Sequence, residues 1–214
     1  LKRLPISPQP PLAQENDASG LLVESGVPSV LGIDPGTEKS ALIRINSEGV
    51  PLDRSILRNL ELLENLEMLY NLPEPAPTLA IEMVASYGMA VGKDTFETVR
   101  WIGIFQHAYG IENTMLVYRK DIKLWLCGSY RAKNTHVRQA LIDKFGGDLK
   151  AIGNKKCPHC KGKGWFGAGR PTCEQCLGKK WLHPPGPLAG IASHEWSALA
   201  VALYGQHLLK GGKV

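Results

Sequence analysis

The sequence lacks any apolar run approaching the roughly 18 residues that a membrane-spanning helix needs. Its first residues, Leu1-Lys2-Arg3 and a Pro- and Gln-containing continuation, also lack the apolar centre of a secretory signal. We therefore expect a protein without a membrane partner that works in the reducing environment of the cytoplasm. We interpret residues 1–28 as a loose N-terminal leader that precedes the folded core.

Acidic residues are scarce between positions 118 and 180, where 4 Asp and Glu accompany 15 Lys and Arg. The rest of the chain holds 16 Asp and Glu against 10 Lys and Arg, so the net charge of +5 conceals one strongly basic block. A solvated surface usually mixes the two signs, whereas a surface that binds phosphate groups concentrates positive charge. The distribution therefore favours binding of nucleic acid.

Cysteine is sparse except in one short segment. Four of the five cysteines form two Cys-x-x-Cys pairs, Cys157 with Cys160 and Cys173 with Cys176. Two such pairs supply four thiolates for a tetrahedral Zn²⁺, and a site closed by four Cys ligands is structural rather than catalytic. Because this polar segment is too short to fold by apolar burial, we expect the metal to supply its folding energy. Two disulfides are the alternative, and they fit a reducing compartment poorly.

Other residues of the same segment leave more than one interpretation open. His159 and His183 are spare metal ligands beside the four thiolates. Trp165, Phe166 and Trp181 alternate with lysines, a composition that suits phosphates and unstacked bases. The same aromatic residues could equally form a small core for the segment itself. The fifth cysteine, Cys127, is interpreted as a buried apolar residue.

Apolar runs and helical periodicities alternate along most of the chain. The patterns predict strands at 30–33, 40–45, 78–84 and 115–118. They predict helices at 53–70, from 94 or 95 onwards, at 121–126, at 135–145 and at 193–204. In the second of these helices Asp94 or Thr95 is the predicted N-cap. One face should carry Phe96, Val99, Ile102, Gly103 and Gln106, and Gly103 should allow a close approach by another element. Ser193 is the predicted N-cap of the last helix.

Two of the predicted strands each carry one acid near the carboxyl end, Asp34 and Glu82. A buried carboxylate costs several kcal/mol unless it is paired, hydrogen-bonded or bound to a cation. For Asp34 alone, a simpler role is to open the following Pro-Gly turn. His194 and Glu195 lie in the first turn of the last helix, where both could face the strand ends, although Glu195 could merely favour the helix dipole. Together these residues predict a shared cation site.

Four segments, in this order, resemble RuvC-type Holliday junction resolvases: Gly32-Ile33-Asp34-Pro35-Gly36-Thr37, Ala80-Ile81-Glu82, Asp121-Ile122-Lys123 to Gly128 with Ala132-Lys133, and His194-x-x-Ser197-Ala198-Leu199-Ala200. The resemblance implies an α/β, RNase H-like fold, a mixed sheet flanked by helices. It implies a homodimeric Mg²⁺- or Mn²⁺-dependent endodeoxyribonuclease of DNA recombination and repair. Such an enzyme nicks four-way or branched DNA junctions symmetrically, without a small-molecule cofactor.

By position, Asp34 and Glu82 match the first two metal-binding acids of this family. The other two ligands are expected at the start of the last helix and three residues later, where this chain has His194 and Ser197. Ser197 is a departure because a neutral hydroxyl binds hard cations weakly, and Glu195, one residue out of register, is the candidate to compensate. Lys123 and Lys133 match basic residues that contact the scissile region. We expect further DNA contacts from Arg119, Lys120, Arg131, Lys161, Lys163, Arg170, Lys179 and Lys180.

The cysteine-rich segment interrupts the resemblance and divides the chain. We expect a nuclease core at 29–150, an inserted zinc module at 151–187 and a C-terminal helix at 188–214 that completes the core. The Cys-x-x-Cys-x-Gly-x-Gly form is similar to the repeats of DnaJ-type chaperones, and resolvase variants with such insertions resemble phage proteins, which work in the bacterial host cytoplasm. Two other functions stay open: a catalytically weak or inactive junction-binding protein, and a DnaJ-like module that binds unfolded polypeptide.

Overall fold

The computed structural model describes residues 29–71, 76–86, 88, 90–153, 156–157, 159–163, 165, 171–180 and 185–213, so the predicted leader lies outside the described residues. One mixed sheet has the strand order β3-β2-β1-β4-β5. Its strands are β1 (Val30–Asp34), β2 (Lys39–Ile45), β3 (Pro51–Arg58), β4 (Thr78–Met83) and β5 (Thr114–Tyr118). The helices are α1 (Asn59–Tyr70), α2 (Lys93–Tyr109), α3 (Arg119–Cys127), α4 (Asn134–Lys144), α5 (Asp148–Ala151) and α6 (Glu195–Leu209), with a 3-10 turn at Ile111–Asn113.

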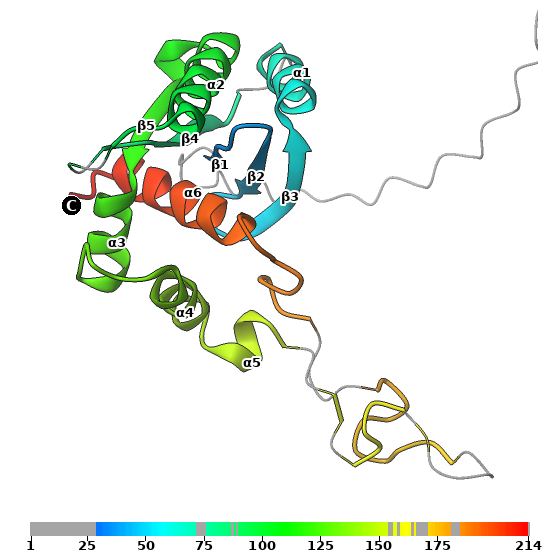
Figure 1. The fold of residues 1–214 in the computed structure, drawn as a ribbon. Helices are drawn as coiled ribbons and strands as arrows, with labels where there is room; N and C mark the ends of the chain where they lie inside the picture. The colour runs from blue at the N-terminus through cyan, green and yellow to red at the C-terminus, as the bar shows by residue number, and fades with distance from the viewer. Residues whose placement is uncertain are drawn as a thin grey trace, which may run out of the picture.

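The central strand β1 separates two apolar cores. It runs antiparallel to β2 and parallel to β4. Because side chains alternate between the two faces of a strand, Leu31 and Ile33 join the core beneath α1 and α2, whereas Val30 joins the core beneath α6. Helices therefore cover both faces of the sheet, as Figure 1 shows, and the predicted mixed sheet flanked by helices is confirmed.

Helix α6 lies directly on the sheet because small residues line the contact. A Cβ atom added to Gly32 would lie 2.3 Å from the carbonyl oxygen of Ala198, and one added to Gly205 would lie 2.8 Å from the Cβ of Ala80. Residues from Trp196 to Gln206 are almost all buried, so α6 is a core helix rather than a surface helix. This close contact brings the start of α6 to the carboxyl end of β1.

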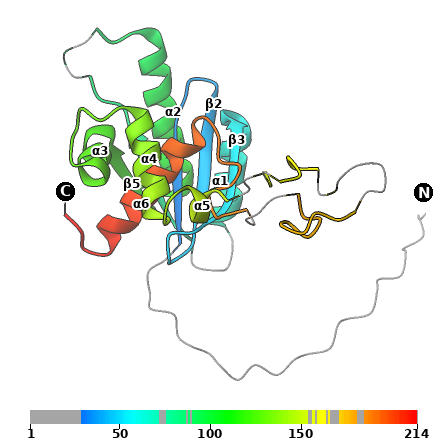
Figure 2. The same ribbon diagram turned by 90° about the horizontal axis from the view of Figure 1, so that it is seen from below.

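Helices α3 and α4 form a wall beside α6 (Figure 2). The ring of Trp125 on α3 packs against Tyr204 on α6, with ring centroids 5.5 Å apart. Helix α3 ends at Gly128, whose left-handed conformation with φ of 67° is easily adopted by glycine. The amino-terminal ends of α3, α4 and α6 thereby surround one part of the surface.

The cysteine-rich segment leaves and re-enters the core at a single point. Gly153 forms an isolated antiparallel bridge with Pro185, and the amide of Gly186 donates to the carbonyl of Ile152 at 2.9 Å. In Figure 1 the described part of the segment, drawn in yellow and orange, extends away from the core beyond α5. Paired ends of this kind are expected of a module inserted into a surface connection.

The predicted helix over residues 53–70 is wrong in its first third. Residues Pro51–Arg58 form edge strand β3, which pairs with β2, and the helix begins only at Asn59. The prediction rests on leucines at helical spacing, and the first of them, Leu57, belongs to β3 although its spacing to Leu60 fits a helix. Pairing with β2 decides between the two.

The face of α2 that carries Phe96 and Val99 lies mostly outside the core. The buried residues are Thr98, Ile102, Phe105 and Tyr109. Phe96 is 66% exposed and Val99 is 37% exposed. An added Cβ at Gly103 would meet nothing within 4 Å, so no element approaches this glycine. The N-cap is Gly92 rather than Asp94 or Thr95.

Ser193 is not the cap of α6. His194 occupies the N-cap position, and Ser193 adopts a left-handed conformation with φ of 45°. A non-glycine residue in this region is strained, and such residues gather at functional sites. The strain lies between the last connection and the first turn of α6.

Candidate metal and nucleic-acid site

Asp34 and Glu82 lie side by side at the carboxyl edge of the sheet. Ile33 of β1 and Ile81 of β4 are register partners in a parallel pair, and the two acids follow them directly. Both acids lie on the strand face that carries Val30 and Ala80, which pack against α6. Their side chains are only 16% and 17% exposed. The structure thus brings together two acids that are 48 positions apart in the printed sequence.

Burial makes both carboxylates costly to ionise. It raises the pKa of Glu82 from 4.5 to about 7, with Arg119 lowering the value and the neighbouring Asp34 raising it. Burial also raises the pKa of Asp34, and hydrogen bonding by His194 and Ser197 partly offsets the rise. A cation bound between the two buried carboxylates would stabilise their ionised forms.

The first turn of α6 supplies two partners for Asp34. His194 Nδ1 lies 2.8 Å from Asp34 Oδ2, and the Ser197 hydroxyl is near enough to lower the pKa of this carboxylate. Residues three apart share one face of a helix, so His194 and Ser197 reach the same carboxylate. These are the two helix positions at which the resemblance places metal ligands. Asp34 does not serve mainly to open its turn, because its carboxylate is directed at α6.

The structure does not bring Glu195 to the two acids. Its carboxylate accepts a hydrogen bond from the Ala192 amide at 2.9 Å, and it lies 3.7 Å from Nε of Arg54 on β3. Glu195 therefore braces the entry to α6 on the side away from Asp34. Its predicted role as a metal ligand stays a prediction, and the carboxylate would have to leave both partners to fulfil it.

Arg119, predicted only as a DNA contact, lies on the acid pair. Its Nη1 is 3.1 Å from Glu82 Oε2, and its Nη2 donates to Asn134 Oδ1 at 2.8 Å. Lys123, one turn later on α3, is near enough to lower the pKa of Glu82. Lys133 is exposed at the start of α4 and, in the described part of the chain, forms no hydrogen bond or ion pair with either acid.

A buried polar network holds the turn that follows Asp34. The Gly36 amide donates to Ser40 Oγ at 3.2 Å, and Ser40 Oγ donates to Asn59 Oδ1 at 2.8 Å. The Asn59 amide group donates to the carbonyls of Gly36 and Thr37 at 3.0 and 3.2 Å. Asn59 is 2% exposed and belongs to α1, so the helix fixes the turn across the sheet edge. Nothing local in the sequence indicates this role of Asn59, because its partners lie 19 to 23 positions earlier.

The converging groups fit a hard divalent cation. Two carboxylates and one imidazole nitrogen meet at a single edge, and carboxylate oxygens are the ligands that Mg²⁺ and Mn²⁺ prefer. Arg119 neutralises one of the two carboxylates, and Asp34 is held by His194 and a neutral hydroxyl. Among the described residues, Asp34 forms its ion pair with His194, which is charged only when protonated, so a cation could compensate the charge of this carboxylate.

Four thiols of the inserted segment form a second candidate metal site. The Sγ atoms of Cys157, Cys160, Cys173 and Cys176 all lie within 4.8 Å of one another. Between the two Cys-x-x-Cys knuckles, the Sγ atoms of Cys157 and Cys173 are 3.8 Å apart and those of Cys160 and Cys176 are 3.7 Å apart. A tetrahedron with metal–sulfur bonds of about 2.3 Å has edges of about 3.8 Å, so the four thiols could hold one ion. All four are free, and the disulfide alternative does not apply here.

The two knuckles repeat one backbone conformation. The residue after each second cysteine has a positive φ, 51° at Lys161 and 48° at Leu177, and a glycine follows in each case. His159 Nδ1 lies 3.8 Å from the Sγ of Cys173, beside the four thiols rather than among them. His183 and the aromatic residues Phe166 and Trp181 lie outside the described residues.

The remaining predicted DNA contacts divide between two surfaces. Lys120 lines a cavity with Arg119, Lys123 and Tyr130, and the Arg131 guanidinium lies 5.6 Å from the centroid of the Tyr130 ring. On the inserted segment the predicted contacts Lys161, Lys163, Lys179 and Lys180 are all exposed, and so is Lys156. Arg170 lies outside the part of the chain that the structure describes.

Two solved structures share this architecture. One is Thermus thermophilus RuvC, with a TM-score of 0.51 and 18% identity over 86% of this chain and 96% of RuvC. The chain has the fold of RuvC. The other is T. thermophilus RuvC in complex with a Holliday junction substrate, with a TM-score of 0.51 and 16% identity over 86% of this chain and 94% of RuvC. No protein-family model matches the sequence, and no curated protein matches it.

The likeness to RuvC confirms the RNase H-like fold, a mixed five-stranded sheet flanked by helices. At these identities it establishes the fold alone. Within the described residues, no helix is long and apolar enough to cross a membrane.

Proposed function

We propose that the protein is a divalent-metal-dependent endonuclease that nicks four-way or branched DNA junctions. The observation that carries the proposal is the pairing of Asp34 and Glu82 on adjacent parallel strands, with His194 of the α6 N-terminus hydrogen-bonded to Asp34. The RuvC fold supports it, because a solved structure of similar fold holds a Holliday junction substrate. The basic block beside the acids provides the charge that a DNA backbone requires.

Asp34, Glu82 and His194 would hold Mg²⁺ or Mn²⁺ in this proposal. When bound, such ions activate water and stabilise charge on the phosphate during hydrolysis. Arg119 holds the Glu82 carboxylate in place and brings a positive charge to the position where phosphate charge accumulates. Lys123 adds a second cation one turn away, and Lys133 is proposed to contact the strand near the cut.

Ser197 and Glu195 take supporting roles. Ser197 lies near Asp34 and would orient that carboxylate rather than replace an acid. Glu195 is bonded to the backbone of Ala192 and faces Arg54, so we propose that it positions His194 at the start of α6. The proposed cation would then have three protein ligands, Asp34, Glu82 and His194, and Glu195 would orient the third of them.

The inserted segment is proposed to be a zinc module that contacts DNA. Cys157, Cys160, Cys173 and Cys176 would hold one Zn²⁺ that supplies the folding energy of residues 151–187. Lys163 lies 5.9 Å from the centroid of the Trp165 ring, so cationic and aromatic groups share one surface of the segment. Two copies of the chain would act together to place two symmetric nicks.

The test uses an immobile four-way junction with labelled strands and compares the wild-type protein with Glu82→Gln and Glu195→Gln. We expect nicking with Mg²⁺ and none with a chelator. Glu82→Gln should cut at least about 100-fold more slowly, because it removes a ligand oxygen, while binding in Ca²⁺ changes little. Glu195→Gln should retain most of the activity. Nicking that survives chelation, or that Glu82→Gln leaves intact, contradicts the proposal.

A second candidate is a junction-binding protein without catalysis. The specific observation in its favour is the neutral Ser197 at a position where the resemblance places a metal ligand, together with Arg119 on Glu82. This candidate predicts tight, salt-sensitive binding of junctions and no product at any concentration of Mg²⁺ or Mn²⁺. Replacement of Ser197 by Asp would then be expected to create or increase nicking.

A further inference from the structure

A cavity of about 570 Å³ opens next to the acid pair, between the first turns of α4 and α6. We call it the Arg138 pocket, and the residues that matter here are Arg119, Asn134, Arg138, His194, Trp196 and Ser197. His194, Ser197 and Arg119 belong both to this pocket and to the surroundings of Asp34 and Glu82. Whatever occupies the pocket therefore lies beside the proposed cutting site.

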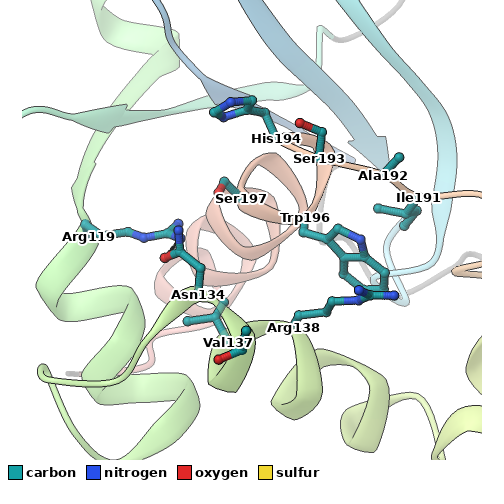
Figure 3. A pocket seen from close by; sticks show the side chains of 11 residues that line it. Arg119, Asn134, Val137, Arg138, Ile191, Ala192, Ser193, His194, Trp196 and Ser197 are labelled. Atoms are coloured by element: carbon teal, nitrogen blue, oxygen red, sulfur yellow. Dashed lines mark hydrogen bonds between the residues drawn. The ribbon is translucent and has the colours of Figure 1, made fainter.

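The pocket has one cationic, flat wall and one polar wall. The Arg138 guanidinium lies over the Trp196 ring, 5.0 Å from its centroid. Figure 3 shows this pair on one side, Arg119 approaching Asn134 on the other, and Ser197 between them. None of the described residues that line the pocket is acidic. Such a site suits an anionic ligand that also carries a flat ring.

Of the two arginines that line the pocket, Arg138 has donor groups that a ligand could use. Arg119 is committed to Glu82 and Asn134. Arg138 is exposed, and within the described residues it forms no ion pair and its contact is the face of Trp196. Trp196 is 8% exposed and packs in the core, so the surface beneath the guanidinium is well ordered by packing. A guanidinium fixed in this way can stack on a base and donate to its edge.

Three neighbouring cavities share lining residues, with the Arg138 pocket between the other two. Ser193 and His194 form the border between the Arg138 pocket and a cavity of about 460 Å³ that contains Asp34 and Lys39. Arg119 links the pocket on its other side to the cavity lined by Lys120, Lys123 and Tyr130. A strand whose phosphate lies at Asp34 would therefore pass over the His194 border into the Arg138 pocket.

We propose that the Arg138 pocket receives one unstacked base of the DNA strand, next to the phosphate that is cut. The volume lies within the range of roughly 300–1,000 Å³ that ligand pockets have, and a single nucleotide fills part of it. Buried Val137, Ile191 and Trp196 give the pocket an apolar floor, which a phosphate alone would not need. This inference rests on the proposed function, since it assigns a neighbouring nucleotide to the same site.

The test is a coupling experiment on junction binding in Ca²⁺, so that cutting is not needed for the readout. Each junction of a set lacks one base at a different position around the branch point. Removing the base that enters the pocket should weaken binding by the wild-type protein about fivefold or more. Arg138→Ala should weaken binding of the intact junction by a similar factor and make binding indifferent to that missing base, because the two losses are one interaction.

Two further variants make the result specific. Arg100→Ala removes the same charge from exposed α2, where Arg100 pairs with Glu97 at 3.5 Å, and it should respond to the missing base as the wild type does. Arg138→Lys keeps the charge but not the planar group, and it should behave as Arg138→Ala does. If Arg138→Lys binds the intact junction as tightly as the wild type does, and no single missing base weakens binding by either protein, the proposal is overturned, because a phosphate held by charge would then occupy the pocket.

The outcomes separate this inference from the proposed function. If Arg138→Ala and the missing base weaken binding independently, or if no single missing base weakens wild-type binding, the pocket proposal is overturned. A protein that nicks junctions without this coupling leaves the nuclease proposal intact. A protein that shows the coupling but never cuts supports the pocket and contradicts the nuclease.

Discussion

Replacement of Glu82 by Gln should stabilise the metal-free protein, although it removes a charged partner of Arg119. Burial raises the pKa of Glu82 from 4.5 to about 7, so the folded protein holds this proton more tightly than the unfolded chain does. Stability therefore falls as the pH rises from about 4.5 to about 7, and the loss is complete above that range. The accumulated cost of ionisation is at most about 3 kcal/mol.

Gln cannot ionise and keeps an oxygen that can accept from Arg119, so Glu82→Gln avoids this cost. In a chelator at pH 8 the variant should be more stable than the wild type by about 1–3 kcal/mol, and near pH 4.5 the two should be equal. For a chain of this size the difference at pH 8 corresponds to about 3–10 °C in Tm. Urea and thermal unfolding at the two pH values measure it.

Glu61→Gln provides a control of opposite sign. Arg58 donates to the exposed Glu61 carboxylate and lowers its pKa, so this variant should lose rather than gain stability at pH 8 relative to low pH. Adding Mg²⁺ at pH 8 should reverse the order for Glu82, because only the wild type gains from metal binding. If Glu82→Gln is less stable than the wild type at pH 8 without metal, attraction to Arg119 outweighs burial and the reasoning is wrong.

Three other perturbations test the framework around the site. Gly32→Ala places a Cβ 2.3 Å from a backbone oxygen of α6 and should lower the free energy of unfolding in urea by about 1–3 kcal/mol. Gly103→Ala, with open space around it, should not lower it, and equal effects of the two variants would contradict the contact. Asn59→Ala leaves the carbonyls of the turn after Asp34 without their buried donor. It should lower the free energy of unfolding by about 1–3 kcal/mol and slow nicking, and no change in either would refute the network. Native mass spectrometry should find one Zn²⁺ per chain and none in Cys173→Ser, while the core still unfolds cooperatively; zinc retained by the variant would exclude this site.

The sequence predicted the parts of the site that single elements carry. Asp34 and Glu82 each end an apolar run, and an acid at the end of a buried strand needs a partner wherever it occurs. His194 and Ser197 are three apart on one helix, so their shared direction follows from helix geometry. The parallel pairing of β1 with β4 brings the two acids together, and the close contact of α6 with Gly32 of β1 brings His194 and Ser197 to them.

The sequence could not predict contacts between elements that lie far apart in the chain. Arg119 was assigned to DNA by its charge alone, because nothing local indicates that it pairs with Glu82, 37 positions earlier. Asn59 and the Trp196–Arg138 pair were missed for the same reason. Glu195 was placed at the acids by its position in the first turn of α6, whereas the structure directs it to Ala192 and Arg54.

The central claim is that Asp34 and Glu82 share one divalent cation. Mn²⁺ binding followed by electron paramagnetic resonance tests it without any DNA or catalysis, in the wild type and in Asp34→Asn, Glu82→Gln and Glu195→Gln. The account predicts that the wild type and Glu195→Gln bind Mn²⁺ alike and that each of the other two variants loses that binding. Equal binding by all four proteins, or none by the wild type, would contradict the account.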